Sequence, residues 1–134
     1  MELTVKITVN LPVVKCWQLW TTPADIMLWN NAFDDWHTPS VTLDLRDGGS
    51  FLYRMGTKDG SIGFDFKGKY DKVVPNEIIE FTTHDGRKGI NKFVANGDQT
   101  EVMEIFEPEA ATPVDEQRDF CQKILNNFKK YAES

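Results

Sequence analysis

The side chains best suited to chemistry cluster in one segment, Asp34-Asp35-Trp36-His37. A carboxylate beside an imidazole can fix the histidine tautomer and let the ring act as a general base. Asp35 and His37 are therefore candidate catalytic residues. The simpler alternative is a structural loop that Trp36 anchors while both aspartates stay in water, since no third catalytic partner is visible.

Glu104 is the second candidate acid or base. Alternation places it on one strand face with Val102 and Phe106, while Met103 and Ile105 share the other face. If the Glu104 face points inward, the carboxyl lies in an apolar interior, where burial raises its pKa. If the opposite face points inward, Glu104 is only solvated. Both faces carry two apolar residues, so both orientations stay open, and we favour the inward one.

Composition argues against several classes of function. With two histidines and no CxxC, HExxH or phosphate-binding glycine loop, neither a metal nor a cofactor is expected. The net charge of −6 argues against a nucleic-acid partner. No apolar stretch approaches the roughly 20 residues of a membrane span, so membrane insertion is not expected. No secretory signal is visible, and Cys16 and Cys121 are expected as free thiols, which predicts a cytoplasmic protein.

A single domain, residues 1–134, is expected from the length of the chain. Alternating apolar residues predict a first strand over Leu3–Val9. Two short helices follow, one after Pro12 and one after Pro23, and residues 30–39 are predicted to be irregular. The remaining strands are predicted over Val41–Leu45, Ser50–Met55, Ser61–Val74, Ile78–Thr83, Lys88–Ala95 and Thr100–Phe106.

The last segment, from about Pro113 to Ala132, has helical spacing. Its apolar stripe consists of Val114, Gln117, Cys121, Ile124, Phe128 and Tyr131. A strand, two helices, six strands and one long helix define an α+β architecture. The aromatic residues exceed what a thin sheet–helix layer needs, which favours a cavity between the sheet and the last helix.

These segments together resemble the helix-grip fold of the START and birch-pollen-allergen (SRPBCC) superfamily, which includes polyketide cyclases. Within it the chain looks like the branch named after the activator of heat-shock-protein ATPase. The resemblance rests on segments in a fixed order: Pro12–Trp20, Asp44–Phe51, Lys58–Tyr70, Asp85–Arg87 and Gln117–Tyr131. Asp35-Trp36-His37 is similar to a segment of a narrower bacterial subgroup.

The resemblance implies a curved antiparallel sheet of about seven strands that grips the C-terminal helix, with two short helices between the first two strands. The cavity between sheet and helix often holds an apolar small molecule in such proteins. The resemblance does not fix an activity, because relatives include cyclases, lipid carriers and co-chaperone modules. In one departure, Phe120-Cys121 stand where the family would have Gly-Trp.

The candidate ligand-binding residues are large apolar side chains of the sheet, the last helix and the segment before the sheet. They are Trp29, Phe33, Trp36, Phe51, Tyr53, Met55, Phe64, Phe66, Phe81, Phe93, Phe120, Ile124 and Phe128. Of these, Trp29, Phe33 and Trp36 are expected near the mouth of the cavity.

The leading expectation is binding of a small apolar or lipid-like molecule in an internal cavity, without catalysis. The runner-up is a cyclase- or hydrolase-type enzyme that uses Asp35, His37 or Glu104. The third is a chaperone-interacting, stress-response module. Relatives that act on a chaperone usually carry a second domain, for which this chain has no room, so a chaperone partner is not expected. A homodimer is compatible with all three.

Overall fold

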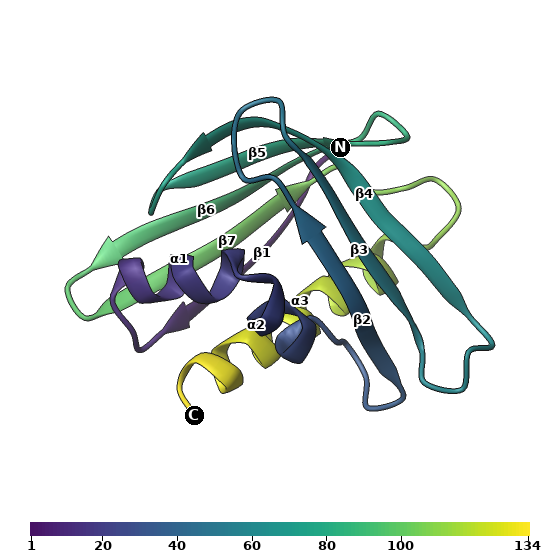
Figure 1. Ribbon diagram of the computed structural model, residues 1–134, viewed down its shortest axis with the longest axis horizontal. Helices are drawn as coiled ribbons and strands as arrows, with labels where there is room; N and C mark the ends of the chain where they lie inside the picture. Colours follow the sequence, from purple (N-terminus) through teal and green to yellow (C-terminus); the bar gives the residue numbers. More distant parts are fainter.

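Seven strands form one antiparallel sheet, and three helices pack against it (Figure 1). The computed structural model describes residues 1–134. The strands are β1 (Leu3–Val9), β2 (Trp36–Leu43), β3 (Ser50–Thr57), β4 (Gly63–Val74), β5 (Ile78–Thr83), β6 (Lys88–Asn96) and β7 (Gln99–Phe106). The helices are α1 (Val13–Thr21), α2 (Pro23–Trp29) and α3 (Val114–Ala132).

The strand order is β1-β7-β6-β5-β4-β3-β2, so the first and last strands of the chain are neighbours. The strands from β2 to β7 follow one another as hairpins, and α1 and α2 carry the chain from one edge of the sheet to the other. In Figure 1 the sheet curves around α3, while α1 and α2 lie on the same side of the sheet as α3. This arrangement confirms the predicted α+β helix-grip fold.

The stripe of α3 that faces the sheet forms the centre of the core. Phe128 has no exposed surface, and its ring packs edge-on against Trp20 and Trp29 at centroid distances of 5.0 and 4.9 Å. Ile124 and Leu125 are also buried. The predicted stripe contained Ile124 and Phe128 but not Leu125, because the buried face of a helix is wider than a single row of side chains.

The segment predicted to be irregular, residues 30–39, is shorter than expected, because β2 begins at Trp36 rather than at Val41. Its pairing with β3 shifts register between His37 and Ser40, which leaves Pro39 at a bulge. Proline is tolerated there because β2 is an edge strand and needs no further hydrogen-bond donor on its outer side. Apolar and polar residues do not alternate around this bulge, so the sequence pattern does not predict the first part of the strand.

Two adjacent glycines form the turn before β3 for different reasons. Gly48 has a φ of +80°, which a residue with a side chain rarely adopts. Gly49 lies so close to the preceding chain that a Cβ atom would meet the Asp44 carbonyl oxygen at 1.9 Å. Gly48 is therefore needed for its positive φ, and Gly49 for the close approach of the Asp44 backbone.

Candidate functional site

A cavity of about 140 Å³ lies between α3, the end of α2 and the concave face of the sheet. Most of the predicted binding residues line it, because strand alternation and the helix stripe both direct them inward. These residues are Trp29, Tyr53, Met55, Phe64, Phe66, Phe81, Phe120 and Ile124. The cavity is therefore predominantly aromatic.

Glu104 lies on the inner face of β7 and lines this cavity. Its neighbour on one side is Val5 of β1, and its neighbour on the other side is Asn91 of β6. Val5 is buried, so the register fixes the inward orientation that alternation alone left open. Directly opposed residues of an antiparallel pair have Cβ atoms about 5 Å apart, which brings the Glu104 and Asn91 side chains together.

Both polar side chains of this pair are without a hydrogen-bond partner in the protein, and both face the cavity. Asn91 is 8% exposed, and an apolar residue, Ile79, is its neighbour on β5. Glu104 is half-buried, so the polar atoms of this pair are open to the cavity and available to a molecule inside it.

Burial raises the pKa of Glu104 to about 7, because the cavity solvates a carboxylate poorly. Burial also raises the pKa of Tyr53, with smaller contributions from Tyr70 and Glu104. The thiol of Cys121 lines the same cavity, and burial together with the charge of Glu104 raises its pKa. Cys121 is thus a protonated thiol rather than a nucleophile, and Glu104 is the group that changes charge near neutral pH.

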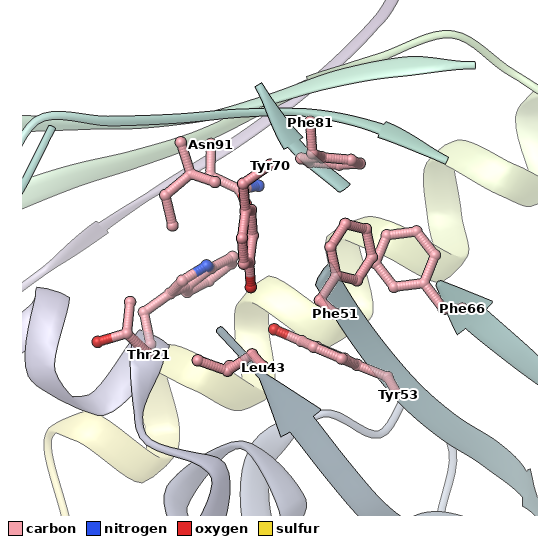
Figure 2. A pocket seen from close by; sticks show the side chains of 10 residues that line it. Thr21, Leu43, Phe51, Tyr53, Phe66, Tyr70, Phe81 and Asn91 are labelled. Carbon is pink, nitrogen blue, oxygen red and sulfur yellow. The ribbon is translucent and has the colours of Figure 1, made fainter. Parts of the chain in front are cut away.

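A second hollow of about 20 Å³ adjoins the cavity and shares Tyr53, Phe66 and Asn91 with it. Figure 2 shows the hydroxyl groups of Tyr53 and Tyr70 pointing into this hollow. Phe51 lines the hollow rather than the main cavity. A space of this size holds about one water molecule, so the hollow extends the polar side of the site without adding room for a ligand body.

Aromatic residues before and at the start of β2 pack against the wall of the cavity from outside. Phe120 contacts Phe33 and Trp36 at centroid distances of 6.3 and 6.2 Å, and Trp36 also contacts Phe64 at 6.0 Å. Phe33 is 44% exposed and carries the Lys123 ammonium over its ring at 4.3 Å. Phe33 and Trp36 therefore flank the cavity without lining it.

Asp35 and His37, the other catalytic candidates, do not lie in the cavity. Both are exposed, and His37 pairs with Gly56 of β3. Because β2 already begins at Trp36, alternation turns His37 to the outer face between the inward Trp36 and the buried Thr38. Asp35 and His37 therefore do not line the cavity, and their role in polar chemistry at its mouth stays a prediction.

Phe93 and Phe128 belong to the core and not to the cavity wall. Phe93 packs edge-on against Trp17 and Trp20 at centroid distances of 5.2 and 5.8 Å. Both phenylalanines point inward as expected, but α1 fills the space in front of Phe93.

No group of three His, Cys, Asp or Glu side chains is arranged to hold a metal ion. None of the three helices combines the length and the apolar character that a membrane-spanning helix needs.

Sequence analysis missed several residues that line the cavity. These are Trp20, Asn30, Asn91 and Cys121. Asn91 carried a usable signal, because it alternates with Gly89 and Phe93 and so had to share their inward face. Its pairing with Glu104 needed the register of two strands, which alternation within one strand does not provide.

The curved sheet around a long C-terminal helix, with an aromatic cavity between them, defines a helix-grip protein. The family model described as activator of Hsp90 ATPase homolog 1-like protein matches residues 10–133, and the chain belongs to this family. Comparison with curated proteins finds no match.

Solved structures agree with this assignment. An AHSA1-like protein from Aeromonas hydrophila is 35% identical, with a TM-score of 0.91 over 99% of this chain and 92% of that one. A protein from Cytophaga hutchinsonii is 45% identical, with a TM-score of 0.85 over 98% and 92% of the two chains. A Colwellia psychrerythraea structure described as an Aha1 dimer is 17% identical, with a TM-score of 0.78 over 99% and 96%, and shares the fold.

Proposed function

We propose that this protein binds a small molecule with an apolar body and one polar end in the cavity between α3 and the sheet. The observation that carries the proposal is the unpaired Glu104–Asn91 pair within an aromatic wall. Both side chains offer hydrogen-bonding groups to the cavity that the protein leaves unused, and a ligand with a matching polar end would pair with them in place of water. The aromatic residues would enclose the apolar body.

The size of the cavity favours a compact ligand over a long lipid chain. At about 140 Å³, the cavity is smaller than the roughly 300–1,000 Å³ of pockets for drug-sized molecules. A single ring with a short substituent suits this volume. The two free cysteines suit a reducing compartment, and we place the protein in the cytoplasm.

A second candidate function is general acid–base catalysis by Glu104 in a cyclase- or hydrolase-type reaction. One observation favours it: the pKa of Glu104 is raised to about 7, which suits proton transfer near neutral pH. Binding remains the leading proposal because Asp35 and His37, the expected partners of such a reaction, lie outside the cavity.

Native mass spectrometry of the protein purified from its own host tests the binding proposal. A retained small molecule is expected in the wild type. Cys121→Trp should lose it, because the indole would fill the cavity, while Asp119→Trp on the exposed face of the same helix should retain it. Wild-type protein that carries no molecule, and that no compound of a ring-sized library stabilises against heat, would contradict the proposal.

A further inference from the structure

The ionisable groups that line the cavity disfavour a negative charge on the ligand. No lysine, arginine or histidine lines it, and its titratable groups are Glu104, Tyr53 and Cys121. One cation, Arg87, acts on the cavity wall from outside and lowers the pKa of Cys121, but its guanidinium is paired with Asp85 at 2.8 Å. A carboxylate or phosphate on a ligand would therefore face Glu104 without an unpaired cation beside it. Burying two like charges together in a poorly solvated site is strongly unfavourable, so anionic ligands are disfavoured.

The aromatic wall of the cavity favours a positive charge on the ligand. Trp20 and Trp29 pack together at a centroid distance of 4.7 Å, and both line the cavity together with Tyr53, Phe66 and Phe81. The faces of aromatic rings carry partial negative charge and attract organic cations, most strongly where water is excluded. A carboxylate surrounded by aromatic rings thus combines two independent attractions for a positive group.

We propose that the cavity binds a compact organic cation, a protonated amine on a ring-sized apolar body. The ammonium group donates hydrogen bonds to the Glu104 carboxylate and to the side-chain oxygen of Asn91, and the aromatic residues enclose the ring. This inference rests on the proposed binding function and names the chemical class of its ligand.

Electrostatics at longer range supports the inference. The chain carries a net charge of −6, so the field of the whole protein attracts cations and repels anions. The ligand also explains why Glu104 lies unpaired beside Asn91, since an ammonium offers the donors that both oxygens lack.

Ligand charge and pH are then linked through Glu104. Its pKa is raised to about 7, and a bound ammonium favours the ionised carboxylate, so binding releases a proton. Between pH 6 and pH 8 the ionised fraction of a group with this pKa rises about tenfold, and the affinity for an amine that stays protonated should rise by the same factor.

Three probes of one shape and different charge test the inference. Benzylamine, benzyl alcohol and benzoate are titrated at pH 8 while tryptophan fluorescence is recorded, because Trp20 and Trp29 line the cavity. Benzylamine should bind at least about tenfold more tightly than benzyl alcohol, the ratio expected for one well-made ionic contact. Benzoate should bind most weakly. Calorimetry at pH 6, where most of the Glu104 carboxyl is protonated before binding, in buffers of different ionisation enthalpy should show proton release with benzylamine only.

Two variants of β7 separate the charge of Glu104 from general effects on the strand. Glu104→Gln should remove the preference for benzylamine and its pH dependence while benzyl alcohol still binds. Glu101→Gln changes the same residue type on the outer face of β7. This variant should keep both the preference for benzylamine and its pH dependence.

Equal affinity for benzylamine and benzyl alcohol, or a preference for benzoate, would overturn the inference that the ligand is a cation. The cavity would then bind a ligand of another chemical class. If none of the three probes binds, the inference is also overturned. The native mass spectrum then shows whether the cavity holds any molecule, so failure of the ligand class is distinguishable from failure of the binding function.

Discussion

At the scale of single residues, Glu104 makes the stability of the protein depend on pH. The pKa of Glu104 rises from an ordinary 4.5 to about 7 in the folded protein, because burial disfavours the carboxylate. The folded state therefore holds a proton that the unfolded state releases. The free energy of unfolding falls as pH rises from about 4.5 to 7, by about 3 kcal/mol in total.

Glu104→Gln should remove this loss, since an amide has no charge to bury. At pH 5 the variant and the wild type should have similar free energies of unfolding, and at pH 8 the variant should be more stable by about 2–3 kcal/mol. Urea unfolding at the two pH values measures the difference, and the other titrating groups cancel between the two proteins. Glu101→Gln serves as the control. A gap between variant and wild type that is the same at both pH values would show that Glu104 is solvated.

At the scale of elements, α3 and the sheet stabilise each other through one aromatic contact. Phe128 has no exposed surface and lies against Trp20 of α1 and Trp29 of α2. The three rings join every helix of the protein. Removal of the Phe128 ring therefore leaves a void that touches all three helices.

Phe128→Ala should lower the free energy of unfolding by about 3–5 kcal/mol, the usual cost of truncating a fully buried phenylalanine. Urea unfolding followed by circular dichroism gives the value. Lys130→Ala, an exposed position on the same helix, should change it by less than about 0.5 kcal/mol. Melting of Phe128→Ala within a degree or two of the wild type would mean that the core lies elsewhere.

Sequence patterns predicted elements well where one face of the element is buried. Alternation located β1, β5 and β7 with their observed bounds to within a residue, because one face of each strand is more buried than the other over most or part of its length. Alternation did not predict the start of β2, because a bulge at Pro39 interrupts the pattern in this edge strand. The stripe of apolar residues in the last segment predicted the full length of α3.

The site was less predictable than the fold, because it depends on pairs of strands. The aromatic wall followed from alternation in β3 and β4. The Glu104–Asn91 pair depends on the register between β6 and β7, which no pattern within one strand reveals. An irregular segment at residues 30–39 would leave His37 free to face the cavity, whereas the strand that begins at Trp36 turns it outward.

At the scale of the whole molecule, the two halves of α3 are attached differently. The C-terminal half is tied to distant parts of the chain: Tyr131 donates to Asp25 of α2 at 2.5 Å, and Lys129 donates to the Thr8 carbonyl of β1 at 2.7 Å. In the N-terminal half, Gln117 bonds to the loop just before the helix, and one bond from Gln122 reaches β1. This half carries the residues that cover the cavity.

The N-terminal half of α3 should therefore open more readily than the C-terminal half in the protein without ligand. A hollow beneath a helix removes packing contacts, and local opening is easiest where few buried contacts and long-range hydrogen bonds hold the chain. Hydrogen exchange followed by NMR should show backbone amides of residues 118–124 exchanging at least about tenfold faster than those of residues 125–131, a difference of about 1.4 kcal/mol in opening free energy.

Fraying of the C-terminal end of α3 alone would give the opposite order, with the last residues of the chain exchanging fastest. Tyr131→Phe removes the bond to Asp25 while keeping the ring, so it should speed exchange in residues 125–131 and narrow the difference between the halves. The exposed Lys130→Ala should leave both rates unchanged. Equal protection along α3 would show that the helix opens as one unit, and faster exchange in its C-terminal half would show that the cavity does not weaken the N-terminal half.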